Sequence, residues 1–338
     1  MLPKPVIPAQ AGIHRNSPIN PKLQRLKNPW TKIDGCYLSA FVSPPTESTT
    51  QYFVNADGLA AYENKIGRKL AIVMIFLAWG KKESMQPFPK AWCQAMSEHG
   101  AIPHITWEPW DFVKTSESYR NPKIAAGLWD DYIRSWARDI KAWGQPLFLR
   151  WGHEMNADWY PWAGGICEGG APAYVAAYRH IVELFRAEGA SNVIWIWCPD
   201  TVIWNSQQAP FKYEPYYPGD DVVDWIAFDG YNFAQDADPT KPWVPFTKLY
   251  ADIYERCSKL NTKAPFMIGE FASGEKGGSK AQWITDAYAA IQTQFPRIKA
   301  VTWFDIDKES HWPVDSSVES LAAFRAAVGD GYFRDHLW

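Results

Sequence analysis

The sequence lacks the features that would assign it to several common functional classes. Its 338 residues include 34 basic and 37 acidic side chains, and the net charge of −3 leaves no positive excess for nucleic acid or an anionic membrane. No apolar run reaches the roughly 18 residues that a membrane-spanning helix needs. We therefore expect a globular monomer that has neither nucleic acid nor a membrane as a partner.

Paired metal ligands are also missing. The five cysteines form no CxxC and no Cys/His cluster, and their odd number favours free, mostly buried thiols. A zinc-binding HExxH motif that began at His153 would need a second histidine at position 157, where Ala157 stands. The sequence therefore predicts no metal and no cofactor.

The first 28 residues contain prolines at 3, 5, 8, 18 and 21 and lack the apolar segment of a secretory signal peptide. With few large apolar side chains, they are expected to be disordered or peripheral. Residues 29–338 are expected to form a single domain.

Aromatic residues are abundant: they make up 16% of the chain, which contains 20 Trp. Leu and Ile would fill a core equally well, so the excess indicates rings that act at a surface, for example by stacking on the flat faces of sugars. We expect about half of the rings to serve simply as packing.

Eight short apolar runs are spread along the chain from residue 35 onward. Their Val, Ile, Phe and Trp residues are continuous rather than alternating, which is typical of parallel strands buried on both faces. The predicted strands are Gly35–Phe41, Leu70–Trp79, Ala101–Glu108, Pro146–Trp151, Asn192–Cys198, Asp224–Phe228, Pro265–Glu270 and Lys299–Phe304.

Helical patterns lie between these runs, and Gly, Pro and Asn mark several of their ends. They cover Gly58–Arg68, Asn121–Trp143, Pro172–Glu188, 245–260, 279–294 and 317–328. The alternation over about 300 residues predicts an α/β fold, a single-domain (β/α)8 TIM barrel. A doubly wound open sheet is the alternative, but no GxGxxG follows the first run.

Two of the predicted strands run into a glutamate. The run Phe148-Leu149-Arg150-Trp151 leads into Gly152-His153-Glu154, and the run from Pro265 ends at Glu270. The carboxyl ends of barrel strands carry the chemistry, so two carboxylates there predict the acid and the nucleophile of retaining glycoside hydrolysis. For Glu270 the alternative is a structural ion pair with an arginine such as Arg150.

Aromatic residues near these strand ends are candidates for contact with a sugar. The loop Asp158-Trp159-Tyr160-Pro161-Trp162 follows the fourth strand, and we expect Trp159 and Trp162 to contact the substrate. Trp303, at the end of the eighth run, is expected to form a stacking floor for the reacting sugar.

Two further alternatives compete with a glycosidase. Gly274, Gly277 and Gly278 follow the seventh strand, where barrels bind phosphate, although an ordinary turn explains them equally well. A phosphate-binding enzyme would also predict lysines at the strand ends, which are lacking. A catalytically silent carbohydrate-binding barrel would keep the aromatic residues but would not need both glutamates.

The motifs around the two glutamates resemble those of glycoside hydrolase family 26, which includes β-1,4-mannanases, mixed-linkage β-glucanases and β-1,3-xylanases. The segment Arg150–Trp162 resembles the acid/base motif of that family, and Ile268-Gly269-Glu270-Phe271 resembles its nucleophile motif. Tyr217-Pro218-Gly219-Asp220, Asp224 and Asp229-Gly230-Tyr231 resemble its sixth-strand motif. The similarity covers about residues 33–330.

The resemblance implies a role for each matching residue. Glu154 would be the general acid/base and Glu270 the nucleophile. Tyr231 would hydrogen-bond the nucleophile, and His153 and Trp159 would contact the sugar at the cleavage point.

The chain departs from the family pattern at one position. Mannanases of the family often place a histidine after the third-strand tryptophan, whereas here Trp107 is followed by Glu108. We expect both residues to contact the substrate. The resemblance favours an endo-β-glycanase that acts on a polysaccharide or oligosaccharide, with β-1,4-mannan slightly ahead of mixed-linkage β-1,3-1,4-glucan. A secreted or periplasmic location is expected from this substrate class.

Overall fold

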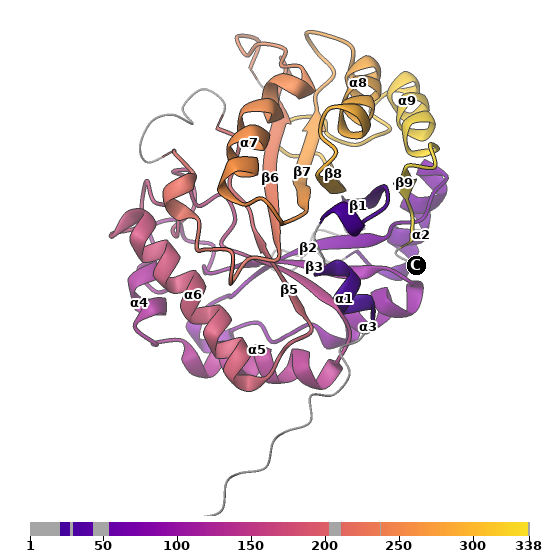
Figure 1. Cartoon of the computed structure of the whole chain (residues 1–338). Coiled ribbons are helices and arrows are strands. Elements are labelled where there is room, and N and C mark those ends of the chain that lie inside the picture. Colours follow the sequence, from indigo (N-terminus) through magenta and orange to yellow (C-terminus); the bar gives the residue numbers. More distant parts are fainter. Residues whose placement is uncertain (1–20, 28–29, 43–53, 203–210, 237, 337–338) are drawn as a thin grey trace, which may run out of the picture.

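Eight parallel strands close into a barrel in the computed structural model, which describes residues 21–27, 30–42, 54–202, 211–236 and 238–336 (Figure 1). Each strand pairs with its neighbours in the sequence, and the first pairs with both the second and the eighth. The strands are β1 (Cys36–Val42), β2 (Ile72–Ala78), β3 (Ile102–Glu108), β4 (Leu147–Trp151), β5 (Val193–Trp197), β6 (Trp225–Asn232), β7 (Phe266–Ser273) and β8 (Ile298–Asp305). The predicted TIM barrel is confirmed, and the open sheet is wrong.

All eight predicted strands are present, with differences at their ends. β6 continues past the predicted end at Phe228 to Asn232, and β7 continues past Glu270 to Ser273. Asp229, Tyr231 and Glu270 therefore lie on extended backbone, which fixes the direction of each side chain. A short ninth strand, β9 (Phe333–Arg334), pairs with β1 and was not predicted.

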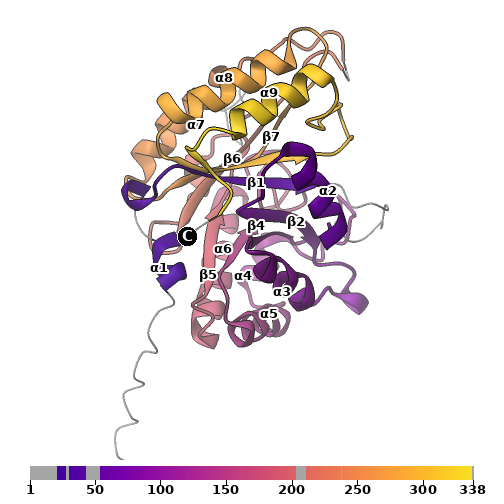
Figure 2. The ribbon, with the colours of Figure 1, turned by 90° about the vertical axis from the view of Figure 1, so that its right-hand side faces the viewer.

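The helices surround the barrel, and Figure 2 shows α7, α8 and α9 side by side along one flank. Gly127, at a φ of +86°, separates α4 from α5 within a stretch predicted as one helix. The helix α3 was not predicted. The bounds are α2 (Ala56–Ile66), α3 (Lys90–His99), α4 (Asn121–Ala125), α5 (Asp130–Trp143), α6 (Gly170–Glu188), α7 (Phe246–Leu260), α8 (Lys280–Thr293) and α9 (Val318–Val328). Among the described residues, no helix is long and apolar enough to cross a membrane.

A short helix, α1 (Pro21–Leu26), covers the amino-terminal end of the barrel and lies in front of the strands in Figure 1. Leu23 and Leu26 are buried in a cluster with residues near the start of the strands, such as Ile72 and Phe148. The indole of Trp225 donates a hydrogen bond to the carbonyl of Leu26. Residues 21–27 thus belong to the packed barrel although they fall in the segment expected to be disordered or peripheral. Residues 1–20 lie outside the described part, and the boundary at residue 28 stays a prediction.

Candidate active site

Arg150 organises the floor of the site at the carboxyl end of the strands. Its side chain on β4 is fully buried, and its Nη1 donates to both carboxylate oxygens of Asp229 on β6, at 2.9 and 2.7 Å. Its Nη2 donates to Glu270 Oε1 on β7, at 2.5 Å. The ion pair considered as a structural alternative for Glu270 therefore exists. It is compatible with a nucleophile, because the guanidinium group holds one carboxylate oxygen in place and leaves the side chain at the carboxyl end of β7.

The residue before Glu270 has to be small. A Cβ atom on Gly269 would lie 2.5 Å from Asp229 Oδ1 and 2.9 Å from Arg150 Nη1. A side chain at this position would push apart the ion pairs that hold Glu270. The glycine of the Ile268–Phe271 motif thus makes room for the network.

Tyr231 binds the second oxygen of Glu270. Its hydroxyl donates to Glu270 Oε2, and its ring packs against Trp312 at 5.1 Å between centroids. Burial, followed by the charges of Glu270 and Asp229, raises the pKa of Tyr231 well above its usual value, so the phenol keeps its proton. The contact that the resemblance implied is present, and both oxygens of Glu270 are oriented.

Glu154 follows β4 with an unusual backbone conformation. Its φ of +53° is in the left-handed region, which costs a non-glycine residue about 1–3 kcal/mol. Two hydrogen bonds hold the turn: the N–H of Glu154 donates to the carbonyl of Cys198 at 2.7 Å, and Trp162 Nε1 donates to the carbonyl of His153 at 2.7 Å. Strain held in this way is common at active sites.

The surroundings of Glu154 favour its protonated form. Burial raises its pKa well above the usual value, and the nearby carboxylates of Asp200, Glu270 and Asp229 raise it further. Trp159 Nε1 donates to Glu154 Oε2 at 2.5 Å and partly opposes this effect. A buried glutamate that keeps its proton is suited to act as a general acid.

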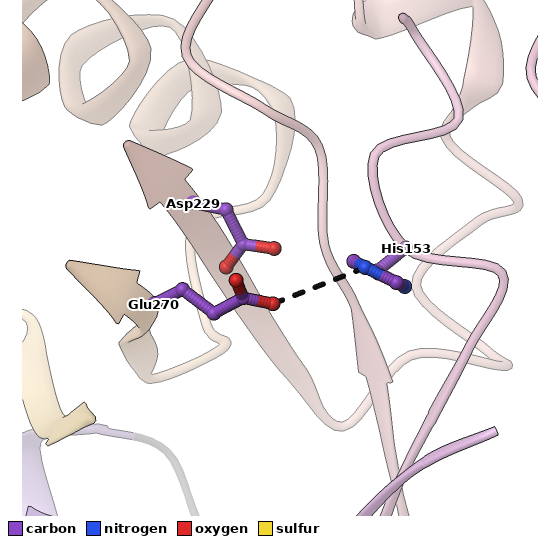
Figure 3. Close-up of side chains that lie close together, drawn as sticks. All are labelled: His153, Asp229 and Glu270. Carbon is purple, nitrogen blue, oxygen red and sulfur yellow. Dashed lines mark ion pairs between the residues drawn. The ribbon is translucent and has the colours of Figure 1, made fainter. Parts of the chain in front are cut away.

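His153 faces Glu270 across the site, with its Nε2 at 3.9 Å from Glu270 Oε1 (Figure 3). Its side chain is 1% exposed, and neither ring nitrogen has a hydrogen-bond partner within the described part of the chain. Burial, and then the positive charge of Arg150, lowers its pKa well below the usual value. His153 is therefore a neutral imidazole that can still bind a ligand hydroxyl.

Three side chains lie close enough together to hold a metal ion: one ligand atom each from His153, Asp229 and Glu270 lies within 4.8 Å of the others. However, both oxygens of Asp229 and one of Glu270 accept hydrogen bonds from Arg150. A cation at this point would lie against the guanidinium group. The donor set fits an ion-pair network better than a metal site.

Two of the predicted substrate contacts are wrong. Trp107 on β3 is fully buried and stacks on Trp136 of α5, with centroids 4.5 Å apart. Trp303 on β8 is also fully buried and packs against Trp283 of α8 and Phe324 of α9. Successive strand residues point to opposite faces, and these two point outward to the helices.

Trp162 also differs from the prediction. It is fully buried, and its ring stacks on that of Tyr160 at 4.3 Å while its indole nitrogen binds the carbonyl of His153. Its indole supports the backbone of His153, and its ring has no exposed surface for a substrate. Trp159 is 37% exposed and remains a candidate for sugar contact.

Glu108 lies on the opposite face of β3 from Trp107 and is 5% exposed. Burial raises its pKa to about 7, and the charge of Glu270 adds to this effect, whereas a hydrogen bond from Trp110 Nε1 opposes it. Glu108 thus lies within electrostatic reach of Glu270, and its contact with a substrate stays a prediction.

Asp200 and Phe76 were not predicted as site residues. Asp200 follows β5 and interacts with Glu154, and Phe76 on β2 packs edge-on against His153 at 5.8 Å. The rule that identified Glu154, an acid just past an apolar run, would also have found Asp200. Nothing in the sequence distinguishes Phe76 from the other apolar residues of its strand.

The glycine-rich loop after β7 does not form a phosphate cradle. Asp236 accepts hydrogen bonds from the backbone N–H groups of Glu275 at 2.8 Å and Lys276 at 3.2 Å. A Cβ on Gly274 would lie 2.3 Å from Asp236 Oδ2. A carboxylate of the chain already occupies these donors, so the loop is a turn and the phosphate alternative is wrong.

Known proteins resemble this chain in sequence and in fold. Residues 78–275 match the family described as glycosyl hydrolase family 26. Endoglucanase H of Acetivibrio thermocellus is 38% identical over 81% of this chain and 29% of its own length. β-1,3-Xylanase TXYA of a Vibrio species is 30% identical over 63% of this chain and 44% of its own length. The chain thus spans less than half of each of these relatives.

Among solved structures, the mannanase BCman of Bacillus subtilis has the same fold, with a TM-score of 0.62 over 95% of both chains. At a sequence identity of 17%, this similarity supports the fold alone.

Proposed function

We propose that this chain, which belongs to glycosyl hydrolase family 26, is a retaining endo-β-glycanase with Glu154 as its acid/base and Glu270 as its nucleophile. One observation carries the proposal. Two carboxyl groups at the same end of the barrel have opposite environments: Glu270 is held by Arg150 and Tyr231, whereas Glu154 is buried among other acids. Carboxyl groups in such different environments can take the roles of nucleophile and acid.

In the first step, Glu154 donates its proton to the glycosidic oxygen while Glu270 attacks the anomeric carbon. The bond from that carbon to the leaving oxygen breaks, and a covalent glycosyl ester forms on Glu270. The hydrogen bonds from Arg150 and Tyr231 aim the attacking carboxylate.

In the second step, the ionised Glu154 takes a proton from water, and the resulting hydroxide attacks the anomeric carbon. The ester bond to Glu270 breaks, and the carboxylate returns to its partners. Two inversions at one carbon retain the anomeric configuration.

His153 and Trp159 are proposed to hold the reacting sugar. The nitrogens of the neutral imidazole have no partner among the described residues and can bind a sugar hydroxyl, and the exposed indole of Trp159 can stack on a ring. Trp159 also binds Glu154, so it would position acid and substrate together.

For the substrate, we propose a gluco-configured β-glucan ahead of the β-1,4-mannan expected from the sequence. Glucose and mannose differ in the orientation of one hydroxyl, at the second carbon. Glu108 presents two carboxyl oxygens that can accept hydrogen bonds, where the histidine that mannanases often have would offer one ring nitrogen that donates and one that accepts. The relative that is 38% identical carries the name endoglucanase, which agrees with this choice.

The experiment measures initial rates on barley β-glucan, galactomannan, glucomannan and β-1,3-xylan, with NMR of the first-formed anomer. We expect β-glucan to be cleaved fastest, with the β-anomer appearing first. Rapid cleavage of galactomannan without activity on β-glucan would restore mannan as the proposed substrate. A first-formed α-anomer would contradict the retaining mechanism, and inactivity on all four would favour a silent binding barrel.

A further inference from the structure

Glu154 has a carboxyl partner that the mechanism above does not use. Asp200, three residues after the end of β5 at Trp197, lies beside Glu154, and its negative charge raises the pKa of Glu154. A carboxylate can only accept a hydrogen bond, so two carboxyl groups bond to each other only when one of them carries a proton. Two buried carboxyl groups that lie side by side favour a state in which one proton is held between them.

Hydrogen bonds between two turns hold Glu154 and Asp200 beside each other. Asn156 Nδ2 donates to the carbonyl of Asp200 at 2.9 Å, and Asn156 Oδ1 accepts from the N–H of Asp200 at 2.9 Å. The N–H of Glu154 donates to the carbonyl of Cys198 at 2.7 Å. Three hydrogen bonds thus tie the turn after β4 to the turn after β5.

The carboxyl group of Asp200 is itself oriented. Its Oδ1 accepts from the N–H of Val202 at 2.6 Å, and its backbone forms a parallel bridge with Asp229. This hydrogen bond fixes the orientation of the Asp200 carboxyl group. The arrangement is independent of any substrate.

We propose that Asp200 is a positioning residue of this active site, which shares one proton with Glu154 and retains it there until the glycosidic oxygen accepts it. The inference rests on the proposed function, because it assigns a partner to the proposed acid. The pair carries one proton and a charge of −1 at rest. It reaches −2 after the proton leaves, and it regains the proton from the water that cleaves the ester.

The same pairing assists both steps. Before the reaction, the negative charge of Asp200 makes loss of the proton from Glu154 to solvent unfavourable. After the first step, Glu270 is an uncharged ester, which removes one of the charges repelling the doubly ionised pair. That pair is a stronger base toward water than an isolated glutamate would be.

Other charged groups also act on the pair. Burial raises the pKa of Asp200 to about 7, and Glu270 adds to the rise, whereas the hydrogen bond from the Val202 N–H and the neighbouring Glu154 carboxyl group oppose it. Around Glu154 and Asp200, the titratable groups that interact with one or both from neighbouring elements are Asp229, Glu270, Tyr160, Tyr231, Tyr250 and Lys308. Of these, only the two carboxylates resemble Asp200 in charge, and both are engaged by Arg150.

The first test is the pH profile of kcat/KM for a natural β-glycan. Asp200→Asn keeps an oxygen for the Val202 N–H but removes the charge, so the basic limb should move to lower pH by about one unit or more. The matched control is Asp158→Asn, which removes the same charge from an exposed side chain in the loop after β4 and should leave the limb in place. An unchanged limb in Asp200→Asn would overturn the proposal.

A second readout separates this role from a purely structural one. With a 2,4-dinitrophenyl glycoside, whose leaving group needs little protonation, release of the glycosyl-enzyme limits the rate. Asp200→Asn should then lower kcat and KM together, by about tenfold, because Glu154 becomes a weaker base. A rise in KM without a fall in kcat would contradict the pairing.

A third readout needs no activity and so separates this inference from the proposed function. Carboxyl ¹³C NMR, with the Glu154 signal assigned by its loss in Glu154→Gln, follows the titration of Glu154 directly. In Asp200→Asn, its midpoint should fall by at least about one pH unit. Equal midpoints in the two proteins would refute the proton sharing even if the chain is an active glycosidase. If the midpoint shifts but Glu154→Ala and Glu270→Ala still hydrolyse glycan normally, the proton sharing stands and only the proposed function is refuted.

Discussion

The guanidinium group of Arg150 lies 2.5 Å from the carboxylate of Glu270 and is fully buried. Because the same group also neutralises Asp229, the proposed nucleophile stands in a network that contains two negative charges and one positive charge. Removal of one member from such a buried network leaves an uncompensated charge in the interior.

Arg150→Met should therefore destabilise the fold, because Asp229 and Glu270 would stay buried without a cation. We expect a loss of about 3–5 kcal/mol in the free energy of unfolding. Urea denaturation measures it, with Arg179→Met as the control, since Arg179 pairs with Asp221 in a more exposed ion pair. An equal, small loss in both variants would show that the buried network contributes no more than a surface contact.

Replacing each glutamate by alanine should separate the two roles. Glu154→Ala should cripple cleavage of natural glycan but largely spare aryl glycosides, whose leaving groups need little protonation in the first step. Glu270→Ala should abolish both activities, because no nucleophile remains. Steady-state rates on the two substrate types measure this. Equal losses on both substrates in both variants would exclude the assignment.

Tyr231→Phe should impair catalysis without unfolding the protein. It removes the donor to Glu270 Oε2 and keeps the ring that packs on Trp312. A hydrogen bond to a charged group is worth about 1.5–3 kcal/mol, so kcat should fall about 10- to 100-fold. Tyr178→Phe is the control: its buried hydroxyl has no partner among the described residues, and kcat should not change. A normal kcat in Tyr231→Phe would remove this contact from the mechanism.

Glu108 should make stability depend on pH. Its folded pKa of about 7 lies above the ordinary value of 4.5, so the folded state binds more protons between these limits. Its contribution is therefore fully present below about pH 4.5 and declines as the pH rises toward 7. The difference in unfolding free energy between Glu108→Gln and the wild type should therefore shift in favour of the variant as the pH rises from 5 to 8, by up to roughly 3 kcal/mol. Chemical denaturation at the two pH values measures the difference, and a constant difference would refute the prediction.

Leu26→Ala should show that α1 is part of the folded unit. Leu26 is fully buried, and truncation of such a side chain costs about 2–5 kcal/mol. Gln24→Ala, on the exposed face of the same helix, is the control and should change little. Thermal unfolding of both variants provides the measurement. A loss no larger than that of the control would show that residues 21–27 contribute little to stability.

The amino-acid sequence by itself determined the strands of the barrel and the position of both glutamates. Local patterns suffice for this, because a parallel strand covered on both faces needs a continuous apolar run. In a barrel, the carboxyl ends of all strands meet at one end, so Glu154 and Glu270 had to lie near each other.

Only the tertiary structure decided which aromatic rings reach the site. Trp107 and Trp303 are outward-facing although their neighbours Glu108 and Phe304 are on the inner face, because alternate strand residues point to opposite sides. A continuous apolar run hides this alternation: when both faces are buried, composition no longer distinguishes them. The proposed proton sharing between Asp200 and Glu154 depends on two turns that are separated by more than forty residues and tied together by Asn156. Such contacts depend on how distant segments pack, and no local pattern encodes them.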